Sequence, residues 1–244
     1  REAIGDRGIK FTVKTRLGFD SPGVFADLLP LFARHSLDLL TVHGRTVSEM
    51  YRSEVHYDFI RTAVQSVPCP VLANGNVDSP ERAAEVLALT GARGLMIGRG
   101  CIRNPWLFGQ IRAHLRGEPV PRPTGRDVLG YVHALWEATE PPESRERLQV
   151  EQMKRYLNFI GQGIGADAAA AALFLHRIRR ATGRTEFFGI CAEHLDHDDA
   201  VPLIPHPNVP AARNEVSPGS CDAVEADSGR RPSARFPIAR ESGG

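Results

Sequence analysis

Cationic and amide side chains follow short apolar runs at four places in the first half of the chain. The four groups are Lys14-Thr15-Arg16, His43-Gly44-Arg45, Asn74-Gly75-Asn76 and Gly98-Arg99-Gly100. Guanidinium and backbone N–H groups bind phosphate well because they offer several donors in fixed directions. Each group alone has a plain alternative: a solvated Lys14, a core His43, or a simple turn at Gly75. Their repetition after successive apolar runs predicts a shared anion site.

The apolar runs are typical of buried strands, and a helix-like segment follows each one. Strands are expected at residues 9–15, 37–43, 70–74 and 94–98, and helices at 22–35, 57–67, 80–89 and 105–115. Ser79-Pro80 and Asn104-Pro105 are helix-start signals, because each places a capping side chain before a proline. Repeated strand–helix units require parallel strands. The pattern predicts four units of an α/β barrel or a doubly wound sheet.

The composition changes after Gly117. Residues 118–123 are rich in proline and are expected to form a stiff linker. Helical periodicity then predicts a small bundle with helices at 124–139, 145–161, 165–181 and 185–195. From residue 202 apolar residues become sparse, which predicts a disordered tail. The predicted organisation is 1–117, the linker 118–123, a helical domain 124–201 and a tail 202–244.

Composition narrows the class of protein only a little. The net charge of +1 over 244 residues gives no overall sign of nucleic-acid binding, so such binding would depend on a local patch. The apolar runs are shorter than the roughly 20 residues of a membrane span, and no export signal is visible, so we expect a cytoplasmic protein without a membrane segment. Four widely spaced cysteines, Cys69, Cys101, Cys191 and Cys221, predict reduced thiols and no metal site.

The four groups, taken in order, resemble the motifs of the FMN-dependent tRNA-dihydrouridine synthase family. The resemblance lies in K-x-R-x-G from Lys14, H-G-R-T from His43, A-N-G-N from Ala73 and M-I-G-R-G from Met96, followed by N-P-W-L-F. It covers about residues 9–115, and the basic residues near Lys154 and at 177–184 are similar to the family's helical domain. The resemblance implies the second half of an FMN-binding (β/α)8 TIM barrel, followed by a small all-α bundle that binds tRNA.

The resemblance also implies roles for individual residues. Lys14 would lie beside the N1/O2 edge of the flavin, where a cation stabilises the reduced ring. The other implied flavin contacts are His43 near the ring and phosphate, Asn74, Gly75 and Asn76 along the ribityl chain and phosphate, and Gly98 and Arg99 on the phosphate. The family usually has an acidic residue where this chain has Asn76. The candidates for tRNA contact are Arg16, Arg45, Lys154, Arg155, Arg177, Arg180 and Arg184.

The spacing of Arg177, Arg180 and Arg184 predicts that they line one helix face. A solvated helix face is the plain alternative. The implied reaction is the reduction of uridine to 5,6-dihydrouridine in tRNA, with NADPH as reductant, and the target base must first leave its stack.

The family's proton-donating cysteine lies in an N-x-G-C-P segment, and no such segment occurs in this sequence. We therefore expect no catalytic cysteine here and a missing N-terminal half of the barrel. Unpaired strand edges promote association, so we expect this chain alone to be inactive, to associate and to purify without flavin. The alternatives are another FMN barrel such as a dihydroorotate dehydrogenase, a non-catalytic RNA-binding remnant, or an α/β fragment without a function of its own.

Overall fold

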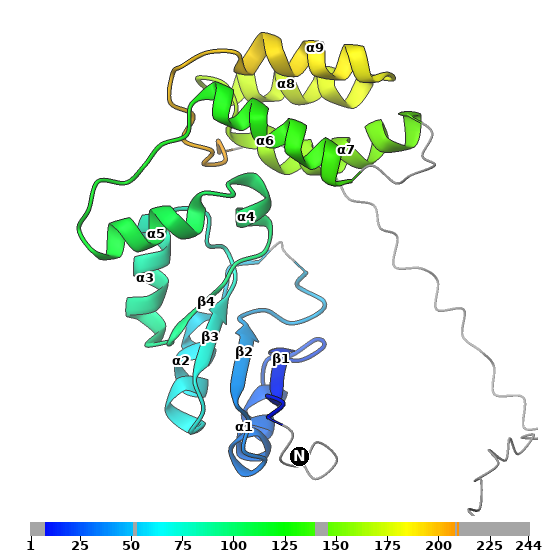
Figure 1. Ribbon diagram of the computed structural model, residues 1–244. Coiled ribbons are helices and arrows are strands. Elements are labelled where there is room, and N and C mark those ends of the chain that lie inside the picture. Colours follow the sequence, from blue (N-terminus) through cyan, green and yellow to red (C-terminus); the bar gives the residue numbers. More distant parts are fainter. Residues whose placement is uncertain (1–7, 51–52, 140–145, 208, 210–244) are drawn as a thin grey trace, which may run out of the picture. The chain divides into compact units, whose positions relative to one another are not determined.

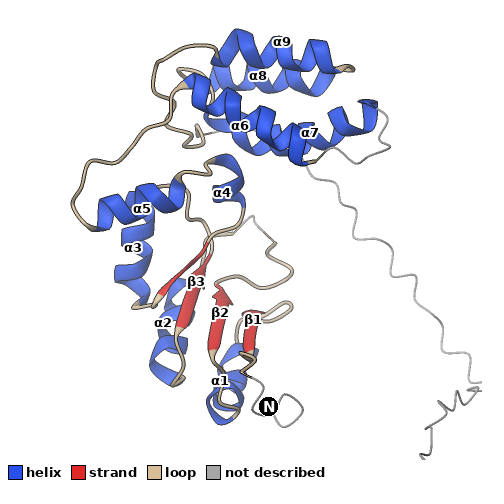
Figure 2. Cartoon of the chain, viewed as in Figure 1, coloured by secondary structure: helices blue, strands red, loops and turns tan. Residues whose placement is uncertain are grey.

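The computed structural model describes residues 8–50, 53–139, 146–207 and 209. Within these residues four strands form one parallel sheet in the order β1-β2-β3-β4 (Figure 2). The strands are β1 (Thr12–Arg16), β2 (Leu39–His43), β3 (Val71–Asn74) and β4 (Gly94–Met96). The four predicted strands and their parallel arrangement are confirmed, with bounds that shift by a few residues.

Three helices alternate with the strands: α1 (Val24–Arg34), α2 (Tyr57–Ser66) and α3 (Pro80–Thr90) (Figure 1). One face of the sheet packs against them, because Leu40, Val42 and Ala73 are fully buried in one apolar cluster with helix residues such as Phe25 and Ile60. Successive strand residues point to opposite faces. The residues between these apolar ones therefore face away from the helices, and they include the predicted site residues.

The two predicted helix starts have different outcomes. The Ser79 side chain accepts a hydrogen bond from the Arg82 N–H at 3.1 Å and Pro80 is the first residue of α3, as predicted. The helix expected from Pro105 instead begins at Leu107, as α5 (Leu107–Leu115). The Asn104 side chain accepts from the Trp106 N–H at 3.1 Å, which forms a turn before the helix. The short helix α4 (Arg99–Arg103) was not predicted, since five residues carry too little periodicity.

The second half of the described chain is helical, with a core of its own. The helices are α6 (Gly125–Ala138), α7 (Glu146–Ile160), the 3-10 helix η1 (Gly161–Gly163), α8 (Ala168–Arg180) and α9 (Arg184–Leu195). Met153, Leu157, Phe174 and Phe187 are fully buried at its centre. Four helices were predicted here, and all four are present.

The helical part contacts the α/β part through α4. Arg103 of α4 donates to the Phe159 carbonyl oxygen at 3.1 Å and to Gln162 Oε1 at 2.8 Å. The Tyr131 hydroxyl donates to the Ile102 carbonyl oxygen at 3.0 Å. Residues up to Ala211 form one compact unit, and the second unit, from residue 212, lies outside the described residues. Residues 118–123 thus connect two parts that also touch directly.

Two predictions about the second half are wrong. Arg184 does not share a helix face with Arg177 and Arg180, because α8 ends at Arg180 and Arg184 begins α9 after the extended Gly183. The predicted tail also starts too early. Leu203 is fully buried in the helical core, and the His206 N–H donates to the Gln162 carbonyl oxygen at 3.0 Å. The rest of the predicted tail, from residue 210, lies outside the described residues.

Candidate anion-binding site

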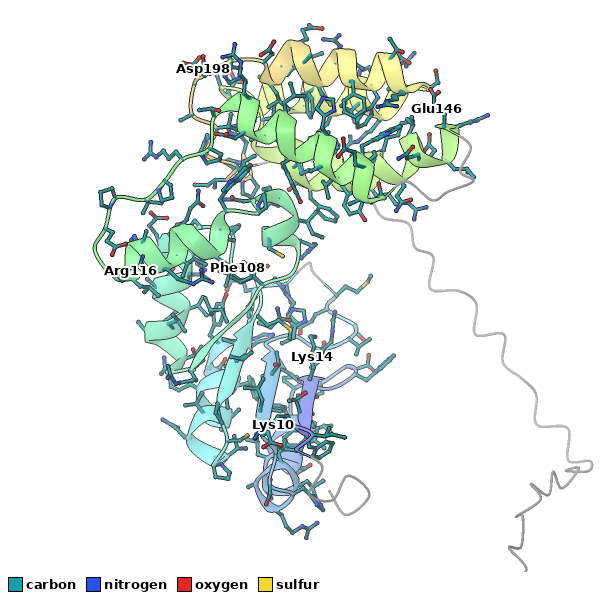
Figure 3. All side chains as sticks on the ribbon, in the orientation of Figure 1. Lys10, Lys14, Phe108, Arg116, Glu146 and Asp198 are labelled. Atoms are coloured by element: carbon teal, nitrogen blue, oxygen red, sulfur yellow. The ribbon has the colours of Figure 1, made fainter. Side chains whose placement is uncertain are left out.

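The predicted site residues form a row across the carboxyl edge of the sheet. Arg16 of β1 pairs with His43 of β2, His43 pairs with Asn74 of β3, and Asn74 pairs with Met96 of β4. Neighbouring strands are about 4.8 Å apart, and residues paired in a parallel ladder point to the same face. Lys14 lies two residues before Arg16 on β1 and therefore shares that face (Figure 3). The register alone brings these four chain segments together.

A pocket of about 420 Å³ opens at this edge. Its volume lies within the roughly 300–1,000 Å³ of small-molecule sites. All the predicted flavin contacts line it, together with two of the predicted tRNA contacts: Lys14, His43, Asn74, Gly75, Asn76, Gly98, Arg99, Arg16 and Arg45. Gly98 leaves space here, because an added Cβ would meet no atom within 4 Å.

The pocket is strongly cationic. Its described lining holds five cations (Lys14, Arg16, Arg45, Arg99 and Arg103) and one carboxylate, that of Asp78. Burial, and after it the charges of Arg16, Arg45, Lys14 and Arg99, lower the pKa of His43 to about 4. His43 is therefore neutral at pH 7 and can donate one hydrogen bond and accept another. A site with this charge favours a multiply charged anion such as a phosphate group.

Arg45 was expected to reach the substrate, but its guanidinium is directed into the loop after β2. The side chain is 1% exposed and donates to the Ser53 carbonyl oxygen at 2.9 and 2.5 Å and to Asn76 Oδ1 at 3.3 Å. Burial and the nearby Arg99 lower its pKa. Arg45 thus ties the β2 loop to the β3 loop while adding its charge to the pocket.

Two glycines allow this loop to approach the sheet. A Cβ at Gly44 would come within 2.7 Å of Val55 Cγ1, and one at Gly75 within 2.9 Å of the same side chain. Gly75 also has a φ of 138°, which other residues rarely adopt. The Tyr57 hydroxyl donates to the Gly75 carbonyl oxygen at 2.8 Å and holds the turn from the other side. The glycines of the predicted motifs therefore fix the loop geometry around the pocket.

Five lining residues lie outside the predicted motifs: Val77, Asp78, Arg103, Phe159 and Gln162. Arg103 is 7% exposed, and burial lowers its pKa. It binds Phe159 and Gln162, which come from the end of α7 and from η1. No local pattern marks Phe159 and Gln162, because they reach the pocket only through the contact between the two parts of the chain.

The predicted tRNA-binding cations of the helical part lie outside the pocket and differ in their surroundings. Lys154 is 11% exposed and pairs with Glu151 at 2.6 Å, and Arg177 holds Glu193 with two hydrogen bonds of 2.6 and 2.7 Å. Arg184 lies over the Trp136 ring at 5.3 Å. Arg155 and Arg180 are exposed. These cations lie on three different helices, and Lys154 and Arg177 are already paired with carboxylates.

The other side chains with reactive or metal-binding chemistry form no second site in the described part of the chain. Cys69, Cys101 and Cys191 are free thiols there, and burial raises the pKa of Cys191 to about 12. Cys221 lies outside the described residues. The described residues contain no group of three or more His, Cys, Asp or Glu side chains placed to hold a metal ion. None of the helices described is both long and apolar enough to span a membrane.

The fold and the site define a parallel α/β protein with a cationic pocket at the carboxyl ends of its strands. The family model described as "Dihydrouridine synthase (Dus)" matches residues 1–182. The chain therefore belongs to the dihydrouridine synthase family. Of the two kinds of FMN barrel considered from the sequence, the match favours a dihydrouridine synthase over a dihydroorotate dehydrogenase.

Curated relatives give the same result. The chain is 40% identical over 135 residues to tRNA-dihydrouridine synthase B of Vibrio vulnificus, a match that covers 53% of this chain and 42% of that protein. It is 38% identical over 132 residues to a probable tRNA-dihydrouridine synthase of Rickettsia prowazekii, covering 53% of this chain and 40% of the relative. The matched segment thus spans about two fifths of the length of these relatives.

Proposed function

We propose that the strand-end pocket binds the phosphate and ribityl part of FMN, and that the protein acts in the reduction of uridine to 5,6-dihydrouridine in tRNA with NADPH as reductant. The observation that carries this proposal is the row Arg16–His43–Asn74 with Lys14 beside it, which places two cations, an imidazole and an amide on one face of three neighbouring parallel strands. Membership of the dihydrouridine synthase family supports the assignment of the anion as a flavin phosphate.

The residues present fit this cofactor. Arg99 would hold the phosphate, and Gly98 leaves open space beside it. Asn76 lines the pocket, and its Oδ1 accepts a hydrogen bond from Arg45. Its side-chain NH2 group can donate to the cofactor. Neutral His43 adds one donor without further positive charge. When bound, FMN would supply the hydride for the uridine ring.

Lys14 would act on the ring end of the cofactor. It lies on β1, three strands away from β4, which the predicted phosphate residues follow. A cation there favours an electron-rich ring, because its charge offsets the negative charge of reduction. The N-x-G-C-P segment that carries the family's catalytic acid does not occur in this sequence. We therefore predict that the chain on its own is inactive.

The RNA part of the proposal rests on exposed cations of the helical part, which include Arg155, Arg180 and Arg184. Arg16 also lines the pocket and donates to the Thr46 carbonyl oxygen at 2.8 Å. Backbone neutralisation by such cations makes RNA binding dependent on salt.

Binding of added FMN to the chain tests the cofactor assignment. Quenching of FMN fluorescence should saturate for the unmodified chain, and Arg99→Gln should weaken binding by about tenfold, the loss of one charge-assisted contact. Arg112→Gln is the matched control, because Arg112 is an exposed arginine of α5 outside the pocket. If Arg99→Gln and Arg112→Gln bind FMN equally well, the pocket is not its phosphate site. Retention of an unmodified tRNA transcript on a filter tests the RNA part separately.

A further inference from the structure

A second hollow lies beside the pocket, along one face of α7. This α7 groove has a volume of about 360 Å³ and is lined by Ile102 of α4 and by Leu148, Glu151, Gln152, Arg155, Tyr156 and Phe159 of α7. The six α7 residues fall at positions i, i+3, i+4, i+7, i+8 and i+11, which places them on one side of the helix. Phe159 lines both the α7 groove and the strand-end pocket. The α7 groove is therefore a neighbour of the strand-end pocket.

The side chains of the α7 groove are available to a ligand. Arg155 is exposed and has no hydrogen-bond or ion-pair partner among the residues that the structure describes. Lys154, its neighbour in sequence, is by contrast 11% exposed and bound to Glu151. Of the two cations in this pair, Arg155 is the one that can take a new anionic partner without breaking a contact.

The two aromatic side chains of the α7 groove are partly buried against neighbouring residues. Tyr156 is half-buried and packs against the helical core, and Phe159 is half-buried at the junction with the pocket. The backbone of Phe159 is fixed as well, since its carbonyl oxygen accepts from Arg103 at 3.1 Å. A half-buried ring loses little conformational freedom when a ligand stacks on it. Tyr156 thus offers a rigid platform one helical turn away from the pocket wall.

An aromatic platform next to an unpaired arginine is the combination that binds single-stranded nucleic acid, where bases stack and phosphates pair with cations. We propose that the α7 groove binds the nucleotide next to the target uridine in a single-stranded RNA segment, with its base on Tyr156 and its phosphate on Arg155. This inference rests on the proposed function, because an RNA substrate in the pocket is what brings a neighbouring nucleotide to the groove.

The fluorescence anisotropy of a labelled short oligouridine, measured with the full chain over a salt series, tests this inference. Tyr156→Leu should weaken binding by about tenfold, the effect of removing one stacking ring. Tyr156→Phe keeps the ring and should bind like the unmodified chain. Arg155→Gln should weaken binding and reduce the slope of log K against log salt by about 0.7, the contribution of one phosphate contact on a single strand.

Helix α5 supplies the matched controls. Phe108 is 41% exposed and Arg112 is exposed; they lie one helical turn apart on α5, and neither lines the groove. Phe108→Leu removes an aromatic ring and Arg112→Gln removes a guanidinium, as the test variants do, and both should leave the affinity and the salt slope unchanged. Arg155→Gln alters an exposed side chain, so it carries the test even if Tyr156→Leu does not fold.

The outcomes separate this inference from the proposed function. If oligouridine binds but the Tyr156→Leu and Arg155→Gln variants bind it like the unmodified chain, the α7 groove is not the subsite, and the FMN and RNA assignments stand. If FMN binds but oligouridine and the tRNA transcript do not, RNA is not the partner, and the groove inference fails with that part of the proposal. If the α7 variants change only the self-association of the chain, measured by sedimentation, the groove is a protein contact and the inference is overturned.

Discussion

Protonation of His43 is expected to destabilise the protein, because the pocket around its imidazole already holds several cations. Burial and the charges of Arg16, Arg45, Lys14 and Arg99 lower its pKa from 6.5 to about 4 in the folded state. Between these two values the unfolded chain takes up a proton that the folded chain does not. Stability is therefore present above pH 6.5 and is lost as the pH falls towards 4.

The size of this effect follows from the two pKa values. At about 1.4 kcal/mol for each pH unit, the full loss is up to about 3 kcal/mol. Most of it, about 2 kcal/mol, falls between pH 7 and pH 4.5 by the same linkage relation. Other groups also titrate in this range, so the contribution of His43 must be isolated by comparison with a variant that cannot take up the proton.

Urea unfolding of the unmodified chain and of His43→Gln at pH 7 and pH 4.5 provides that comparison. The free energy of unfolding should fall by about 2 kcal/mol more in the unmodified chain than in the variant. The reasoning is refuted if both proteins lose the same free energy, because His43 would then titrate near its ordinary pKa. Addition of FMN should raise the pKa of His43, since a bound phosphate offsets the surrounding cations, and the NMR signal of the His43 ring proton reports this directly.

Two further predictions concern the frame of the site. Arg103→Met should lower the free energy of unfolding by about 1–3 kcal/mol, because the Phe159 carbonyl and the Gln162 side chain would lose a buried donor; an unchanged urea midpoint would show that this contact does not form in solution. Gly100→Ala should lower the free energy of unfolding by about 1–3 kcal/mol, because its Cβ would overlap the Val77 carbonyl oxygen. Gly109→Ala in α5 should instead raise it by about 0.5–1 kcal/mol, because a Cβ there meets nothing within 4 Å. Equal melting shifts for the two alanine variants would contradict this description of the Gly100 turn.

The residues at the carboxyl edge of the sheet could be predicted from the sequence, because the carboxyl ends of parallel strands lie at the same edge. Once Lys14, His43, Asn74 and Gly98 are each assigned to the end of a strand, their proximity follows from the sheet, and the observed register bears it out. The part each residue plays in binding does not follow from proximity. Arg45 lines the pocket as expected, yet its guanidinium is bound to Ser53 and Asn76.

The contact between the α/β part and the helical part could not be predicted. Arg103, Phe159 and Gln162 meet across more than fifty positions of sequence, and each has an ordinary local setting. Arg184 shows the limit of periodicity in another way. Its spacing from Arg177 suits one helix, but the chain leaves the helical conformation at Ala181 and restarts after Gly183. Composition also predicted that the tail begins at residue 202. In the structure the buried Leu203 side chain and the hydrogen bond of the His206 N–H hold that segment against the helical part.

The affinity of the chain for FMN relative to riboflavin tests the central claim most directly, because the two molecules differ only in the phosphate group. Titration calorimetry at pH 7 should give at least about tenfold tighter binding of FMN, since one hydrogen bond between charged groups is worth about 1.5–3 kcal/mol. Arg99→Gln should reduce this ratio, and Arg112→Gln should not. Equal affinities for FMN and riboflavin, or a ratio that Arg99→Gln leaves unchanged, would contradict the assignment of the strand-end pocket as a flavin phosphate site.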